Sequence, residues 1–236
     1  MRLASHCAVA LGEQLEHVLV RAAKVRHLQF VKDFAMPGAP SKPGQGLIRS
    51  GELLQELQSD VALGYETLEG NRGSQYLRRS LVRAIFCFIE AGVEVTKIEI
   101  RSTVRSGMYS APLTDKEQEL LGSTYLVPPP VAKFISLEAN IKRTFRLAAK
   151  IWATDFKLNT SGADFRDFVA AKEARNKLTH PRTLYEIEVT DNDMRLHTVA
   201  GRWFQSEFQR LFKARIHAMA KELPEQHRDQ FLRDFS

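Results

Sequence analysis

The side chains best suited to chemistry lie together in the segment Arg175-Asn176-Lys177-Leu178-Thr179-His180-Pro181. Imidazole takes up and releases protons near neutral pH, so His180 can serve as a general acid or base. The Arg175 guanidinium keeps its charge and offers a rigid fork of donors that matches phosphate oxygens. Asn176 adds an amide beside it. These residue types together could bind an anion and transfer a proton.

This segment ends a helix that the sequence predicts over residues 164–180. At about 100° per residue, the apolar positions of the helix form one stripe, made of Phe165, Phe168, Ala171 and Leu178. Arg175 falls inside the stripe, which is costly for a charge unless it is paired or the stripe continues into a site or an interface. Asn176 and His180 are four residues apart at the edge of the same face. Pro181 must end the helix.

Two features near the motif allow more than one interpretation. An arginine and a protonated histidine in the last turn of a helix both interact favourably with the helix dipole, which requires no site at all. Residues 133–182 contain 11 Lys and Arg against 5 Asp and Glu, a net charge of +6. Such a surface suits a phosphate backbone, although solvated helix faces give similar numbers. Lys172 and Lys177 are the candidates for supporting contacts.

Amphipathic patterns predict the helices that must hold this segment. Long helices are expected over 75–105, 136–153, 164–180 and 191–221, with N-caps at Ser74, Ser136, Asp164 and Thr190. Further helices are expected over 8–35, over 52–63 up to Gly64, and after Thr114 up to Gly122. The alternating residues 184–189 favour an extended segment, and Pro128–Pro130 mark a break. We therefore predict an all-α fold, a four-helix up-and-down bundle with extra N-terminal helices.

The same patterns divide the chain into four parts. Residues 1–46 form an N-terminal helix and a linker rich in proline and glycine, and residues 47–73 form a short helix and a turn. Residues 74–222 form the bundle, and residues 223–236 are a C-terminal tail.

Composition limits the classes of protein that this chain can belong to. Its 236 residues are 44% hydrophobic, enough for a sizeable core, and carry a formal net charge of +6, which favours anionic partners. Cys7 and Cys87 are far apart and outside any zinc-binding pattern, so we expect a reducing cytoplasm. No apolar run is long enough to span a membrane, and the N-terminus does not have the pattern of a signal peptide.

The string Phe165-x-x-Phe168 through Glu173-Ala-Arg175-Asn176-Lys-Leu178-Thr-His180-Pro181 resembles the signature of the HEPN superfamily (higher eukaryotes and prokaryotes nucleotide-binding). That signature is an Arg followed, after four to six residues, by a His, commonly with a small polar residue directly after the Arg. Here four residues intervene, and Asn176 follows the arginine. The resemblance in the helical frame covers roughly residues 74–222.

The resemblance implies a homodimer in which the two motif helices meet. Many HEPN proteins are metal-independent endoribonucleases that act as toxins or in antiviral defence. On that basis His180 would act as general base or acid on the ribose 2′-OH or the leaving oxygen. Arg175 would stabilise charge on the phosphate, and Asn176 would orient the histidine or bind phosphate. RNA would be the substrate, with no metal and no cofactor.

Other functional interpretations stay open. Glu90 on the first long helix could orient Arg175 or His180, as some relatives carry a polar group there, or could be a helix-edge carboxylate near Gly92. The remaining histidines show no metal-ligand spacing. A catalytically inactive HEPN-like module that binds nucleic acid or a partner protein is the main alternative to an enzyme. A third possibility is a toxin-type bundle that a cognate antitoxin or nucleotidyltransferase modifies or inhibits.

Overall fold

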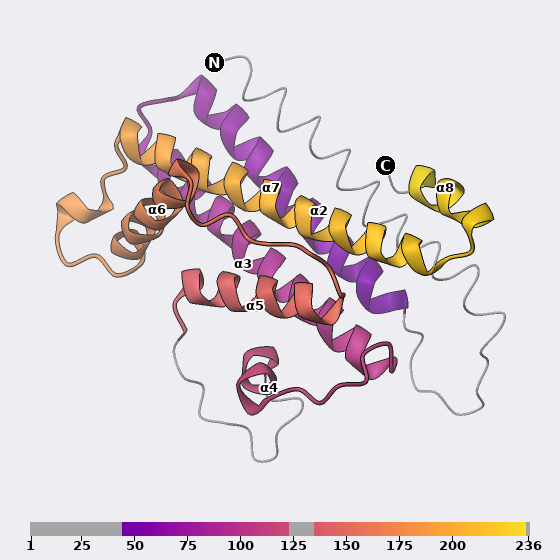
Figure 1. The fold of residues 1–236 in the computed structure, drawn as a ribbon. Helices are drawn as coiled ribbons and strands as arrows, with labels where there is room; N and C mark the ends of the chain where they lie inside the picture. Colours follow the sequence, from indigo (N-terminus) through magenta and orange to yellow (C-terminus); the bar gives the residue numbers. More distant parts are fainter. Residues whose placement is uncertain (1–43, 123–134, 235–236) are drawn as a thin grey trace.

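The computed structural model describes residues 44–122 and 135–234, and every regular element in these ranges is helical (Figure 1). The elements are α2 (Gly44–Gly70), α3 (Gln75–Arg105), α4 (Asp115–Leu121), α5 (Leu137–Ile151), α6 (Ala163–Thr179), the 3-10 turn η2 (Leu184–Ile187), α7 (Asp191–Glu222) and α8 (Glu225–Asp234). The all-α prediction is confirmed. The predicted helix over 8–35, the linker up to residue 43 and the break at Pro128–Pro130 lie outside the described residues.

Most of these helices begin where capping residues predict. Four predicted side chains cap a helix by accepting a backbone N–H of its first turn: Ser74, Thr114, Ser136 and Thr190. α6 differs from the prediction, because its N-cap is Gly162, which has no side chain to accept the bond. Asp164 lies inside the first turn instead, where a carboxylate still interacts favourably with the helix dipole.

The core forms between α3, α5, α6 and α7 and is rich in phenylalanine. Its largest fully buried side chains include Phe86, Phe145, Phe168, Phe204 and Phe208. At Gly92 the backbone of α3 approaches α7 so closely that an added Cβ would lie 2.6 Å from Cε1 of Phe204. Only a residue without a side chain fits at this distance, so Gly92 sets the spacing of the two helices.

The direction of the helices differs from the up-and-down prediction. Gly92 of α3 meets Phe204 of α7, and further along both helices Glu99 pairs with Arg215 at 2.7 Å. Because residue numbers increase in the same direction from the first contact to the second in both helices, α3 and α7 are parallel. Figure 1 shows α2 returning in the opposite direction beside them.

α5 also runs parallel to α7. Phe145 of α5 packs near Phe204, and Trp152 at its end packs against Phe212. Residues 152–162 then run back along α7 before α6 begins, as Figure 1 shows. A parallel neighbour needs such a return connection, which the prediction of short connections did not include.

α2 is longer than the predicted helix over 52–63. It begins at Gly44, inside the predicted linker, and continues through Gly64 to Gly70. A Cβ at position 64 would lie 3.0 Å from Cδ1 of Leu81, so this glycine allows close packing on α3 and does not end the helix. Residues 71–74 then form the turn that the sequence predicts.

Two segments that were predicted to be non-helical are helical. The Glu186 carboxylate accepts the backbone N–H groups of Arg182 and Thr183, and this capping box turns residues 184–187 into η2 instead of an extended segment. Residues 225–234 form α8 instead of a tail. The Arg228 guanidinium donates to backbone carbonyls at the end of α7 and fixes the turn between the two helices.

Candidate functional site

The helix that carries the motif is buried in its first half and exposed at its last turn. The rings of Phe165 and Phe168 lie 5.1 and 4.8 Å from the Trp203 ring, centroid to centroid, and Ala171 is fully buried. Leu178 is half-buried. The exposed residues of the last turn are Asn176, Lys177, Thr179 and His180. The predicted apolar stripe therefore anchors α6 and leaves the motif at the surface.

Arg175 crosses from α6 to α3. Its Nη2 donates to Oε1 of Glu90 at 2.6 Å, and its guanidinium carbon lies 5.5 Å from the centre of the Phe86 ring. The side chain retains 28% of its exposure. The charge that falls inside the apolar stripe is thus compensated by a carboxylate and by an aromatic face. Of the two partners considered for Glu90, the structure pairs it with Arg175.

His180 is the C-cap of α6. Its backbone N–H donates to the Asn176 carbonyl at 3.0 Å, and its φ of −129° and ψ of 60° take the chain out of the helix just before Pro181. Its imidazole is exposed and makes no hydrogen bond within the part of the chain that the structure describes. The Asn176 side chain accepts from Nη1 of Arg175 at 3.4 Å. Within one chain, Asn176 therefore contacts the arginine and not the histidine.

The two supporting lysines differ in their surroundings. The Lys172 side chain is only 13% exposed, and its ammonium lies 3.1 Å from Glu173 and 3.6 Å from Glu138. The pKa of Glu138 is lowered by its hydrogen bond from Lys142 and, to a smaller extent, by Lys172. Lys172 is thus already compensated by carboxylates, whereas Lys177 is exposed. Lys177 is the more exposed of the two. Backbone hydrogen bonds lower the pKa of the Glu186 carboxylate, and the charge of Lys177 adds to that effect.

A buried histidine lies behind the arginine. The His197 ring packs edge-on against Phe86 at 5.8 Å between centroids and is fully buried. Its Nδ1 bonds the Asp193 carbonyl, so we assign the neutral tautomer with the proton on Nδ1. Burial lowers the pKa of His197, against smaller opposing effects of Asp193 and the Ala171 carbonyl. His197 therefore packs against the Phe86 ring, and the Arg175 guanidinium lies over the same ring.

The turn η2 directly after the motif was missed as an ordered element. Leu184 and Tyr185 are 78% and 84% exposed, although both belong to a hydrogen-bonded turn. The signal that predicts such a turn is the spacing Thr183-x-x-Glu186, a capping box in sequence. The alternation of polar and apolar residues over 184–189 obscured it.

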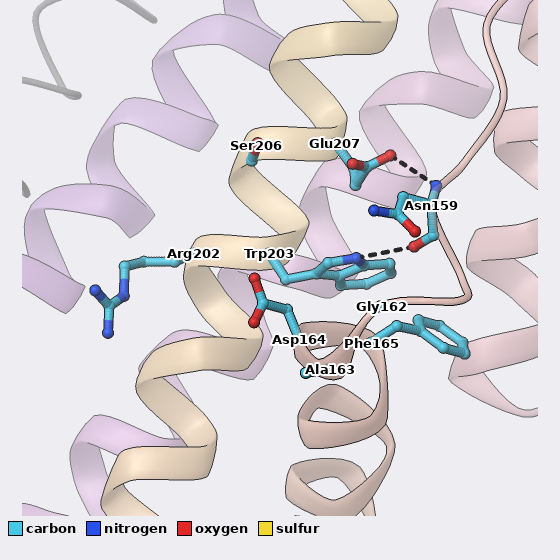
Figure 2. Close-up of a pocket in the computed structure, with 9 residues that line it drawn as sticks. All are labelled: Asn159, Gly162, Ala163, Asp164, Phe165, Arg202, Trp203, Ser206 and Glu207. Atoms are coloured by element: carbon cyan, nitrogen blue, oxygen red, sulfur yellow. Dashed lines mark hydrogen bonds between the residues drawn. The ribbon is translucent and has the colours of Figure 1, made fainter.

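A pocket of about 410 Å³ lies at the other end of α6 (Figure 2). It is lined by Asn159, Gly162, Ala163, Asp164, Phe165, Arg202, Trp203, Ser206 and Glu207. The buried Glu207 accepts the backbone N–H of Asn159 at 3.0 Å, and Nε1 of Trp203 donates to the Asn159 carbonyl at 3.1 Å. These bonds secure the return connection to α7. Every partnered group here has a structural role, and the pocket is separated from the motif by the length of the helix.

The motif end can bind an anion but does not by itself complete a proton relay. The exposed part of Arg175 can donate to a phosphate while Glu90 holds the guanidinium in place. Among the described residues, no proton-transfer group is hydrogen-bonded to the His180 imidazole. The described residues contain no cluster of His, Cys, Asp and Glu able to hold a metal ion. None of the described helices is long and apolar enough to cross a bilayer.

The chain matches no family model, no curated protein and no solved structure. The assignment to the HEPN superfamily therefore stays a prediction that depends on the motif.

Proposed function

We propose that this chain is a metal-independent endoribonuclease whose active site forms when two copies bring their motif ends together. The observation that carries this proposal is a positioned arginine on the same helix end as a histidine whose imidazole has no hydrogen-bond partner among residues 44–122 and 135–234. Glu90 and Phe86 fix the Arg175 guanidinium, and His180 stands exposed at the end of the same helix. A fixed cation can stabilise charge on a phosphate, and an exposed imidazole can transfer a proton, which are two of the roles that metal-free cleavage of RNA uses.

The reaction would proceed by attack of the ribose 2′-oxygen on the adjacent phosphorus. His180 of one copy takes the 2′-hydroxyl proton as the new P–O bond forms. Arg175 stabilises the negative charge that develops on the phosphate oxygens. The bond to the 5′-oxygen breaks, and that oxygen receives a proton from the protonated His180 of the second copy. The products are a 2′,3′-cyclic phosphate and a 5′-hydroxyl, and hydrolysis of the ring leaves a 3′-phosphate.

Two copies are proposed because a single motif end supplies only one proton-transfer group. Two-fold symmetry is the commonest arrangement of identical subunits and would bring two imidazoles and two guanidinium groups to one axis. Like other toxin-type or antiviral nucleases, such an enzyme would act in the cytoplasm. A cognate antitoxin or a nucleotidyltransferase would then be the expected partner that restrains it.

One observation favours a second candidate, an inactive HEPN-like module that binds nucleic acid or a partner protein. Arg175 and Lys172 both face carboxylates, at 2.6 Å from Glu90 and 3.1 Å from Glu173. A carboxylate competes with phosphate for the guanidinium, so binding without cleavage is the alternative outcome of the tests below.

The decisive experiment concerns the products. Purified protein incubated with end-labelled RNA in excess chelator should cleave it and leave 2′,3′-cyclic phosphate or 3′-phosphate ends. DNA, and an RNA with a single 2′-deoxynucleotide at the cleaved position, should resist because the nucleophile is missing. Light scattering should show a dimer. RNA that stays intact while the protein binds it at low salt would replace the enzyme with the binding module.

The arginine provides a second test. Arg175→Ala should lose about 2.7–4 kcal/mol of transition-state stabilisation, by analogy with removal of one oxyanion donor. The matched control is Arg195→Ala in α7. It breaks the 2.7 Å ion pair with Asp167, which lies in α6 but away from the motif. Single-turnover cleavage rates of both variants should differ by the full effect, and equal rates would contradict the role of Arg175.

A further inference from the structure

The turn η2 displays large apolar side chains where a surface turn would normally be polar. Leu184 is 78% exposed and Tyr185 84% exposed. A third exposed ring, Tyr76 at 69%, lies in the first turn of α3, next to residues that bond this region. Single exposed apolar residues need no explanation, but three at one end of the molecule do.

These side chains are held by a rigid turn. Gln75 and Val189 exchange two hydrogen bonds, of 3.1 and 2.8 Å, and Nη1 of Arg79 donates to the Ile187 carbonyl at 3.2 Å. Glu186 closes the other side of the turn, and its pKa is lowered by the backbone N–H groups that it accepts. A ring displayed from such a turn loses little conformational freedom on binding.

The chain between the motif and the ring carries cationic side chains, and the Glu186 carboxylate, directly after the ring, interacts with two of them, Arg182 and Lys177. Residues 174–185 contain three cationic side chains, Arg175, Lys177 and Arg182, and no Asp or Glu. Lys177 and Arg182 are exposed. The five residue steps from His180 to Tyr185 span at most about 18 Å, so the ring lies within a few nucleotides of a phosphate bound at the motif.

This pattern fits one kind of partner better than others. An exposed ring flanked by cations is the arrangement that binds single strands, because bases stack on the ring while phosphates meet the cations. Tyrosine and arginine are also common at protein–protein interfaces, whereas lysine, present here as Lys177, is depleted from them. Base pairs in a duplex cover both faces of each base, so only unpaired nucleotides can stack in this way.

We propose that Tyr185, displayed by η2 beside Leu184, stacks on an unpaired nucleobase of RNA whose backbone is bound at Arg175 and His180. This inference rests on the proposed ribonuclease function and adds the recognition element that selects single-stranded RNA.

The test separates binding from cleavage by using the His180→Ala background. Tyr185→Ala in that background should weaken binding of a fluorescent single-stranded RNA roughly 5- to 150-fold, the cost of one lost stack. Tyr185→Phe and Tyr185→Trp should bind normally, since both retain an aromatic face. Leu63→Ala, which removes a 62% exposed side chain from α2, is the matched control and should change nothing. Binding to a duplex of the same sequence should not respond to Tyr185.

A stacking signal completes the experiment. An RNA that carries 2-aminopurine should lose fluorescence on binding to the Tyr185-containing protein and keep it with Tyr185→Ala. If the wild type cleaves RNA but Tyr185→Ala binds as tightly as its parent, the stacking inference fails and the ribonuclease stands. If Tyr185→Ala changes the oligomeric state in light scattering, the turn is a protein interface and the inference is overturned. If the wild type neither binds nor cleaves RNA, the proposed function fails first and the inference with it.

Discussion

The two ends of α6 are built on different principles. At the N-terminal end, Phe165 and Phe168 pack on Trp203, and the buried Glu207 holds the Asn159 backbone. At the C-terminal end, four of the five residues 176–180 are exposed. Arg175 joins this end to α3 by its bond to Glu90, and Leu178 packs partly against the core. Polar groups at the N-terminal end form hydrogen bonds within the fold, whereas most polar side chains at the C-terminal end are exposed to solvent.

This difference separates stability from chemistry along one helix. Removing a buried aromatic side chain costs several kcal/mol because a cavity remains, whereas removing an exposed side chain usually changes stability by less than about 0.5 kcal/mol. Substitutions at the N-terminal end should therefore reduce the free energy of unfolding, whereas substitutions at the C-terminal end should reduce activity and leave stability nearly unchanged.

The largest expected effect is that of His180→Ala. Loss of the general acid or base should reduce the cleavage rate by about 10²–10⁴-fold or abolish it. The midpoint of urea unfolding should stay within error of the wild type, because the imidazole is exposed and fills no core volume. His217→Ala, which removes another exposed imidazole from α7, is the control and should retain full activity. A variant that keeps cutting RNA would remove His180 from the mechanism.

At the opposite end, Phe168→Ala should lower the free energy of unfolding by about 3–5 kcal/mol. Phe168 is fully buried and its ring lies 4.8 Å from that of Trp203, so its removal leaves a cavity under α6. Any loss of activity should disappear in conditions where the variant is fully folded. Chemical denaturation followed by circular dichroism measures the effect, and a change below about 1 kcal/mol would show that this end of α6 is not the anchor.

The smallest effect is a pH dependence of stability from His197. Its pKa is lowered in the folded protein from the usual 6.5, because burial disfavours the charged ring. Below about pH 6.5 the unfolded chain takes up a proton that the folded chain resists, so the free energy of unfolding should fall as the pH falls. The contribution is complete above that pH.

His197→Asn retains a donor for the Asp193 carbonyl and removes the titrating ring. Unfolding midpoints measured between about pH 5.5 and 8 should therefore slope less in this variant than in the wild type. Parallel slopes would mean that His197 does not titrate differently in the folded and unfolded chain.

Local signals predicted the fold better than long-range ones. Ser74 and Thr190 determine where α3 and α7 begin through bonds within a single turn, so the sequence pattern around each was sufficient. The direction of α5 was not predictable in this way, because it depends on which side of α7 the return connection packs. Gly64 shows the same limit, since its close contact with Leu81 exists only in the folded molecule.

The candidate site was predictable as a set of residues but not as an arrangement. The helical spacing of 100° per residue places Arg175 in the apolar stripe, so its charge requires a partner. The sequence predicts Glu90 as a candidate for that partner. The bond between them crosses 85 positions in sequence, and no local pattern indicates it. The sequence did not indicate a role for Tyr185, because the alternating residues 184–189 favour an extended segment. The capping box of Thr183 and Glu186 instead forms a turn that exposes the Tyr185 ring.

Gly92 has no functional group, yet it lies close in sequence to the carboxylate that pairs with the arginine of the motif. It lies two positions after Glu90, at the point where the backbone of α3 rests on the Phe204 ring. A methyl group there would clash with the buried Phe204 ring, so either the ring or the helix backbone would have to shift. We expect a larger residue at this glycine to disturb the pairing of Arg175 with Glu90, although the position lies inside the core.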